Sequence, residues 1–108
     1  MVDEMEPEEL RDRLDRGENV QVVDIRQPGS FAEGHIPGAT NLPFDRFARE
    51  IDDHEWGEEV VVVCPMGESS LQAARLLESY EAVDEDARVA NLQGGYRGWD
   101  YDLETGSE

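Results

Sequence analysis

Apolar residues lie along this chain in short blocks, separated by turn-forming and acidic stretches. Three blocks are rich in β-branched residues: VQVVDIR at 20–26, EEVVVVC at 58–64 and ARVANL at 87–92. Such blocks are typical of strands, and a run that is apolar on both faces, as at 60–63, favours a central strand of a parallel sheet. The pattern therefore predicts three strands, with the valine run as a central one.

Between these blocks, apolar residues recur at helical spacing. The predicted helices are EPEELRDRLDR at 6–16, FDRFAREI at 44–51 and SSLQAARLLESY at 69–80. The turn-rich segment QPGSFAEGHIPGA leaves room for one short helical turn around Phe31. Strands that alternate with helices indicate an α/β fold with a mostly parallel sheet, and sites in such sheets gather at the carboxyl ends of the strands.

The chain is predicted to fold as a single domain, 1–108, with a core of about residues 5–100 and a flexible tail at 101–108. No internal repeat or low-complexity linker divides it. No stretch approaches the roughly 18 apolar residues that a membrane helix needs, and we expect no signal peptide. We therefore expect no membrane span.

Charge is the most unusual feature of the composition. The 108 residues include 27 acidic and 9 basic side chains, all of the latter arginine, for a net charge of −18. Nucleic acid is therefore not expected as a partner, because its phosphates would be repelled. The acidity runs through the whole chain and not through one local block, which favours an acidic, halophilic protein over an acidic interaction tail. A plain solvating acidic surface is the alternative.

Cys64 is the only cysteine, so we expect no internal disulfide framework, no cysteine-based metal site and a cytoplasmic location. It stands in CPMGESS, where the valine strand ends and a helix begins. Gly67 permits a positive φ, Ser69 and Ser70 are natural helix caps, and a helix amino terminus has unpaired N–H groups. Together these groups could form an anion cradle that stabilises a thiolate. A buried, inert cysteine before an ordinary capped helix accounts for this segment nearly as well.

Two longer motifs flank the cysteine. VVDIRQPGSFAEGHIPGATNLP at 22–43 resembles the first signature of the rhodanese (sulfurtransferase) family, in which D-hydrophobic-R is followed by G-H-I-P-G-A. LQGGYRGW at 92–99 resembles the closing signature of that family, and Cys64 falls between them at the place of the persulfide-forming cysteine. The matching residues are Asp24, Arg26, Gly34, His35, Ile36, Pro37, Gly38, Ala39, Gly94, Gly95, Tyr96 and Trp99. The resemblance covers about residues 5–100.

This resemblance implies a rhodanese-like α/β fold, with a five-stranded, mostly parallel sheet flanked by helices on both faces. It also implies a thiosulfate sulfurtransferase-type enzyme. The catalytic Cys64 thiolate would take the outer sulfur of a donor such as thiosulfate and pass it, as a persulfide, to cyanide or a thiol. Asp24, Arg26 and His35 would give structural support. The loop would bind the substrate through Pro65, Met66, Gly67, Glu68, Ser69 and Ser70.

The resemblance implies no metal and no organic cofactor, because the sulfur is carried covalently. The expected partners are a small sulfur-donor anion and a thiol or thioredoxin-like sulfur acceptor, with neither nucleic acid nor a membrane. The chain is expected to be a monomer or a weak homodimer.

One departure from the family pattern concerns the charge of the loop. Many members carry C-x-x-G-x-R, whereas Ser69 holds the place of the arginine here and Glu68 adds a negative charge. We therefore expect thiosulfate, a dianion, to bind weakly at low salt and better as salt screens the repulsion. Arg97 is the first cation to consider as a stand-in for the missing arginine.

Other functional classes fit the residues less well. A phosphatase or arsenate reductase needs an arginine at the position of Ser70, and a thioredoxin-type protein needs a second cysteine. A non-catalytic rhodanese-fold interaction or regulatory module stays open as the alternative, although the presence of Cys64 and Gly67 favours the enzyme.

Overall fold

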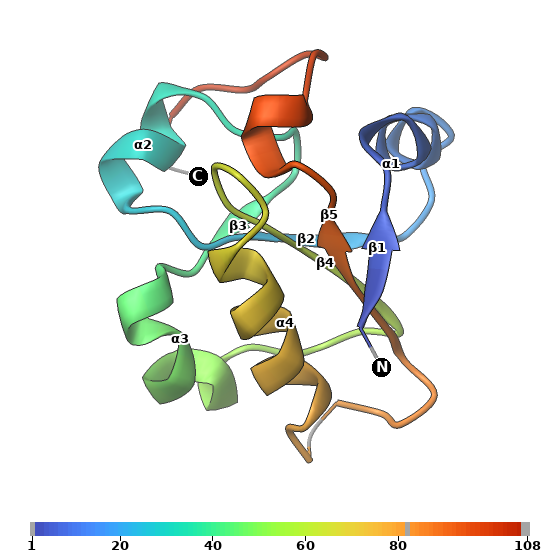
Figure 1. Cartoon of the computed structure of the whole chain (residues 1–108), viewed down its shortest axis with the longest axis vertical. Helices are drawn as coiled ribbons and strands as arrows, with labels where there is room; N and C mark the ends of the chain where they lie inside the picture. The colour runs from blue at the N-terminus through green and yellow to red at the C-terminus, as the bar shows by residue number, and fades with distance from the viewer. Residues whose placement is uncertain (1, 82, 107–108) are drawn as a thin grey trace.

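Five parallel strands form one sheet in the order β1-β5-β4-β2-β3. The computed structural model describes residues 2–81 and 83–106 of the chain (Figure 1). The strands are β1 (Asp3–Met5), β2 (Gln21–Asp24), β3 (Thr40–Asn41), β4 (Glu59–Val63) and β5 (Arg88–Leu92). The helices are α1 (Pro7–Asp15), α2 (Pro28–Glu33), α3 (Phe44–Glu50) and α4 (Ser69–Glu78), with short 3-10 helices η1 (Ile51–Asp53) and η2 (Gly95–Gly98).

The valine run of β4 lies at the centre of the sheet, between β2 and β5. All four of its valines are 0% exposed. Successive strand residues point to opposite faces, so Val60 and Val62 join one core and Val61 and Val63 join the other. Burying such a side chain stabilises the fold by about 1.5 kcal/mol or more, and this strand therefore anchors both halves of the molecule.

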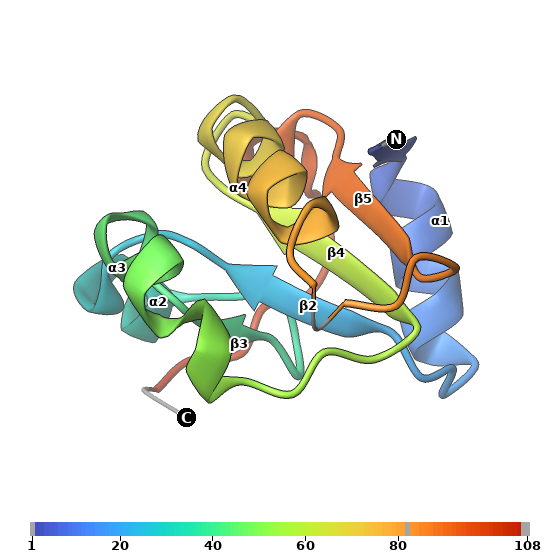
Figure 2. The same ribbon diagram turned by 90° about the horizontal axis from the view of Figure 1, so that it is seen from below.

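Helices cover both faces of the sheet. On one face, α3 and α4 contribute Phe47 and Leu77 to the core around Val60 and Val62. On the other face, α1 and α2 contribute Leu10 and Phe31. Figure 2 shows β5 running between α4 and α1, with the two helices on either side of it. No described helix is long and apolar enough to cross a membrane.

The elements predicted from the hydrophobic pattern are confirmed, with ends that differ by a few residues, and the turn around Phe31 is α2. The five-stranded, mostly parallel sheet with helices on both faces is also confirmed, and all of its strand pairs are parallel. The pattern did not predict β1 and β3. Both are short, and Asp3, Glu4 and Thr40 are exposed, so no apolar run marks these strands.

The carboxyl-terminal stretch, for which the composition predicted a flexible tail, has defined partners. Glu104 and His35 exchange two backbone hydrogen bonds of 2.8 Å, and the Gly106 N–H donates to the Ala32 carbonyl at 2.9 Å. In Figure 1 this red segment passes close to α2. Pairing with a distant turn leaves no local sequence signal, so the composition did not indicate these contacts. Residues 107 and 108 of the predicted tail lie outside the described residues.

Candidate active site

Cys64 follows directly after β4, at the carboxyl end of the sheet's central strand, and only 2% of the residue is exposed. The next residues turn away from the sheet and lead into α4, which begins at Ser69. We call residues 64–68 the cysteine loop. Gly67 has φ +88°, the left-handed conformation that its position in the sequence predicted, so the chain can turn there without strain.

The cysteine loop rests on the backbone of η2. The Tyr96 N–H donates to the Cys64 carbonyl and the Arg97 N–H donates to the Pro65 carbonyl, both at 2.9 Å. A Cβ atom on Gly95, which has φ +56°, would lie 2.1 Å from the Cys64 carbonyl oxygen, so only glycine fits there. Figure 1 shows the yellow loop beside the orange-red η2 turn. The closing glycine motif therefore supports the cysteine directly, through main-chain contacts.

Hydrogen-bonding groups converge on the sulfur of Cys64. The Gly67 N–H donates to Sγ at 3.0 Å, and the Ser70 hydroxyl lies 3.1 Å from Sγ. Burial raises the pKa of the Cys64 thiol, but hydrogen bonds from the Ser70 hydroxyl and from the backbone amides of Ser70, Met66 and Gly67 lower it more. The net pKa is therefore below that of an ordinary thiol, as suits a nucleophilic cysteine.

The two serines behind the loop were predicted to cap the helix and to contribute to the anion cradle. Glu68 holds the N-cap position of α4, and no side chain caps this helix end. Ser70 is 0% exposed, and its hydroxyl is taken up by Cys64 and by the side chain of Asn91. Ser69 is exposed. The hydroxyl of Ser70 thus serves the sulfur and not the helix terminus.

Asn91 is a site residue that the sequence did not point to. It lies on β5, is 3% exposed, and accepts a hydrogen bond from the Ser70 hydroxyl. Its amide nitrogen donates to the Gly67 carbonyl at 3.1 Å, so one side chain contacts both the loop and the first turn of α4. Its position one residue before the LQGGYRGW motif is the only local signal that could have found it.

Asp24 and Arg26 form a network next to the loop, without touching the sulfur. Asp24 is 0% exposed, and Arg26 donates to its carboxylate at 2.8–3.1 Å and to the Gly34 carbonyl at 2.6 Å. The Tyr96 hydroxyl also donates to Asp24, at 2.7 Å, and the Arg26 guanidinium lies 3.8 Å from the centre of the Tyr96 ring. Tyr96 therefore connects this network to the loop, because its own amide holds the Cys64 carbonyl.

This network keeps Arg26 charged and Tyr96 neutral. Burial lowers the pKa of Arg26, but its hydrogen bonds and charge attraction to Asp24 raise the pKa more. Burial and the nearby Asp24 carboxylate raise the pKa of Tyr96 above its ordinary value. A neutral Tyr96 can donate to Asp24 while its hydroxyl oxygen accepts the Ile36 N–H at 3.0 Å, which fixes the turn of the first motif.

His35 is a buried part of that turn. It is 0% exposed, stacks on Phe31 with ring centres 3.8 Å apart, and bonds the Phe31 carbonyl through Nδ1 at 2.8 Å. Its Nε2 has no hydrogen-bond partner among the described residues, and Glu104 Oε1 lies 3.7 Å away. These contacts are with the turn and the carboxyl-terminal stretch, and none is with Cys64.

The outer surface of the cysteine loop is open to solvent. Pro65, Met66, Glu68 and Ser69 are all exposed, and Met66 retains 53% of its surface. The Arg97 guanidinium lies 3.8 Å from Met66 Sδ, at the edge of the loop. Within the described residues, Arg97 makes no ion pair, so its charge is available to an anion that approaches the loop.

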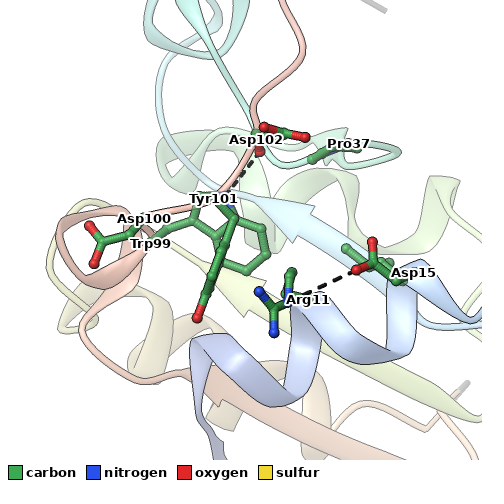
Figure 3. A pocket seen from close by; sticks show the side chains of 8 residues that line it. Arg11, Asp15, Pro37, Trp99, Asp100, Tyr101 and Asp102 are labelled. Atoms are coloured by element: carbon green, nitrogen blue, oxygen red, sulfur yellow. Dashed lines mark hydrogen bonds and ion pairs between the residues drawn. The ribbon is translucent and has the colours of Figure 1, made fainter.

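A separate pocket of about 420 Å³ lies between α1 and the carboxyl-terminal stretch (Figure 3). Trp99 and Tyr101 line it, and the Arg11 guanidinium sits 4.5 Å from the centre of the Tyr101 ring. Its remaining charged lining is acidic and comes from Asp15, Asp100 and Asp102. None of the site residues predicted from the sequence lines this pocket, and its acidic lining does not suit an anionic sulfur donor.

Comparison of the sequence with those of known proteins identifies its family. The sequence profile of the Rhodanese-like domain family matches residues 6–102. This chain belongs to the rhodanese-like family. The rhodanese-like domain is 37% identical to a sulfurtransferase of Allochromatium vinosum over 101 residues, which cover 92% of this chain and 89% of that protein. It is 38% identical to the thiosulfate sulfurtransferase GlpE of Shewanella oneidensis over 87 residues, or 81% of this chain and 82% of that one.

Solved structures agree with this assignment. A rhodanese-like domain protein from Staphylococcus aureus superimposes on the rhodanese-like domain with a TM-score of 0.81 at 28% identity, covering 98% of this chain and 100% of that chain. A rhodanese-related protein from Thermoplasma volcanium gives a TM-score of 0.80 at 19% identity, with 95% and 98% covered, which shows a common fold. The family resemblance of the two motifs is thereby confirmed.

Proposed function

We propose that this rhodanese-like domain is a thiosulfate sulfurtransferase that carries sulfur as a persulfide on Cys64. The convergence of the Gly67 N–H, further loop amides and the Ser70 hydroxyl on a buried sulfur carries this proposal, because such a cradle stabilises a thiolate. The relatives named as sulfurtransferases, which match most of this chain, support the same activity.

In the first half-reaction, the Cys64 thiolate attacks the outer sulfur of thiosulfate. A new S–S bond forms between Sγ and that sulfur, the bond to the sulfonate sulfur breaks, and sulfite leaves with the electron pair. The single negative charge of the thiolate moves to the outer sulfur of the persulfide. The loop amides that lower the pKa of Cys64 would stabilise this charge before and after the transfer.

In the second half-reaction, a nucleophile attacks the outer persulfide sulfur and releases the Cys64 thiolate. Cyanide would give thiocyanate, and a thiolate would give a new persulfide. We propose a small-molecule thiol or a thioredoxin-like protein in the reducing cytoplasm as the acceptor. The exposed outer surface of the loop, with Met66 at its centre, would face this partner.

We further propose that Asp24, Arg26 and His35 support the site without taking part in the chemistry. Asp24 accepts a hydrogen bond from the Tyr96 hydroxyl, Arg26 donates to the Gly34 carbonyl, and His35 bonds within the turn that contains Gly34. Pro65, Met66, Glu68 and Ser69 would contact the donor through the exposed side of the loop, whereas Gly67 and Ser70 face the sulfur.

Intact mass spectrometry after incubation with thiosulfate tests the proposal. We expect a mass increase of one sulfur atom, which cyanide removes with the formation of thiocyanate. The Cys64→Ser variant keeps a side chain of similar size and is expected to show no increase. Because the chain holds a single cysteine, the adduct can be assigned without peptide mapping.

Absence of the adduct with thiosulfate and with other sulfane sulfur donors, at low and at molar salt, would contradict the proposal. That result would favour the alternative of a non-catalytic interaction or regulatory module with this fold. An adduct that persists in Cys64→Ser would equally contradict the role of Cys64.

A further inference from the structure

A chain of hydrogen bonds runs from Cys64 through the interior to the surface of β1. The Cys64 thiol donates to the Ser70 hydroxyl oxygen at 3.1 Å, and the Ser70 hydroxyl donates to Asn91 Oδ1. Asn91 Nδ2 then donates to the Glu4 carboxylate, at 3.2 Å from each oxygen. Ser70 and Asn91 are 0% and 3% exposed, so water does not compete for these bonds, and only Glu4 reaches the surface.

The surroundings of Asn91 determine which way its amide faces. One end lies near acceptors only, namely the Gly67 carbonyl at 3.1 Å and both carboxylate oxygens of Glu4. Acceptors cannot bond to an amide oxygen, so the NH₂ group must be at this end. The oxygen Oδ1 therefore faces Ser70, and it can only accept. Ser70 must use its single hydroxyl proton to satisfy it.

This arrangement sets the direction of the bond between Ser70 and Cys64. A hydroxyl has one proton, and while that proton is given to Asn91, only the lone pairs of Ser70 can face the sulfur. A thiol fits this geometry, because its S–H donates to those lone pairs. A thiolate does not, because it needs the hydroxyl proton for itself. Its formation would leave Asn91 Oδ1 buried without a donor, which is costly.

We propose that Asn91 is a positioning residue that holds the Ser70 hydroxyl as an acceptor toward Cys64 and so favours the thiol over the thiolate. Ser70 then acts as a two-position element, which bonds Asn91 when Cys64 is protonated and the sulfur when it is not. The loop amides stabilise the thiolate and lower the pKa of Cys64. Asn91 limits this lowering, because it competes with the thiolate for the Ser70 hydroxyl proton. This role deepens the proposed sulfurtransferase function and rests on it, since it concerns the same nucleophile.

Charged groups around the chain of bonds come from every neighbouring element. They are Glu4 on β1, Glu68 in the cysteine loop, Arg97 on η2 and the Asp24–Arg26 pair at the end of β2. None of them is changed in the variants below, so their effect on the sulfur is common to all the proteins compared. Asn91→Asp alone adds a carboxylate, which itself disfavours the thiolate, so the fall of the pKa in Asn91→Leu is the deciding result.

The experiment measures the pH dependence of the rate at which iodoacetamide alkylates Cys64. Asn91→Leu and Asn91→Asp are matched, because both keep the shape of the side chain and both lose the NH₂ group, but only Asp still accepts a hydrogen bond from Ser70. We expect the apparent pKa of Cys64 to fall by about one unit in Asn91→Leu. In Asn91→Asp, it should equal or exceed the wild-type value.

Ser70→Ala gives a second, independent test. With Asn91 present, removing the hydroxyl should change the apparent pKa of Cys64 little, because the thiolate loses its bond from Ser70 while the thiol state loses the bond between Ser70 and Asn91. In the Asn91→Leu background, the same substitution should raise it by about one unit, because Ser70 is then free to donate to the thiolate.

An unchanged or raised pKa in Asn91→Leu, or equal shifts in the Leu and Asp variants, would overturn the proposal. A large rise on Ser70→Ala in the presence of Asn91 would overturn it as well, even if neither Asn91 variant folds. Alkylation needs no sulfur donor, so these results stand whether or not Cys64 forms a persulfide with thiosulfate.

Discussion

Two opposite charges lie at the outer surface of the cysteine loop, Glu68 within the loop and Arg97 on the neighbouring η2. Glu68 is an exposed residue of the loop, and Arg97, which is on η2, lies beside Met66 of the loop. A thiosulfate dianion that approaches the outer surface of the loop would experience both charges. Since the loop lacks the arginine that many family members have, Arg97 is the cation that the geometry offers for attracting the donor.

Arg97→Gln is therefore expected to raise the KM for thiosulfate by about threefold at low salt and to leave kcat nearly unchanged. Steady-state kinetics of thiocyanate formation measures both constants. The difference between the two proteins should shrink at molar salt, because exposed charges are then screened.

Arg16→Gln is the matched control for this effect. It removes the same charge from the end of α1, where Arg16 pairs with Glu18 away from the loop. An equal rise of KM in both variants would show that only the net charge matters and would refute a specific role for Arg97. Glu68→Gln should lower the KM if the local charge decides it.

At the scale of single residues, the sequence predicted those whose role is local. Cys64 was found by its place after the valine run, and the positive φ of Gly67 by its place in the turn. Asn91 was missed, because its role depends on β5 lying beside β4, which brings it next to a loop that is distant in sequence. The sequence placed the Ser70 hydroxyl in the cradle around the sulfur, but its bond to Asn91 depends on that same contact between distant segments.

Four elements meet in an ion-pair network at the end of the sheet where β4 and β5 begin, away from Cys64. Glu59 on β4 pairs with Arg13 on α1 and with Arg88 on β5. Arg88 also pairs with Asp3 on β1, at 2.8 Å, and with Glu9 on α1. Glu59 is the acidic centre of this network, and its side chain is 16% exposed. The network ties the edge strand β1 and helix α1 to the central strands.

The network predicts how stability depends on pH. The hydrogen bonds from Arg13 and, to a smaller extent, from Arg88 lower the pKa of Glu59. Burial raises this pKa, but the net pKa stays below the ordinary value. A carboxylate with a lowered folded-state pKa adds stability above the unfolded pKa of about 4.3, and this stability is lost as the pH falls. Glu59→Gln should lower the free energy of unfolding by about 1 kcal/mol at pH 7.

Urea denaturation at pH 7 and at pH 3.5 measures this effect. The difference between wild type and Glu59→Gln should shrink at the lower pH. Glu58→Gln is the control, since it removes the same charge from the neighbouring exposed residue. A difference that stays constant down to pH 3.5, or that Glu58→Gln reproduces, would contradict the role given to the network.

At the scale of elements, apolar periodicity predicted the strands and helices that are held in place by buried side chains. The strands and helices that supply the two cores were found, whereas β1 and β3 were not, because backbone pairing at a sheet edge needs no apolar side chains. The pairing of Glu104 with His35 was likewise out of reach of the pattern. Such contacts are fixed by the completed fold and leave little trace in local composition.

The net charge of the whole molecule predicts how its stability responds to salt. A net charge of −18 on 108 residues creates self-repulsion that favours the unfolded chain in dilute buffer. At about 1 M salt, the Debye length is roughly 3 Å and this repulsion is largely screened. We propose that the protein is adapted to high salt.

Thermal unfolding in increasing potassium chloride tests this adaptation. We expect the Tm to rise by about 10 °C or more between 0.1 and 2 M KCl, because screening removes repulsion that acts over the whole surface. Sucrose at equal osmolality serves as the control for excluded-solute effects. Full stability in dilute buffer, or an equal rise in sucrose, would contradict salt adaptation.

The cysteine loop is held in place by main-chain atoms of η2, with the two carbonyls after β4 bonded to backbone amides and Gly95 packed beneath them. Its outward side chains take no part in that support. Substitutions of these side chains are therefore expected to have little effect on folding, although they can change the preferred sulfur donor or acceptor. Random mutagenesis confined to these outward positions is accordingly the most economical route to altered specificity in this scaffold.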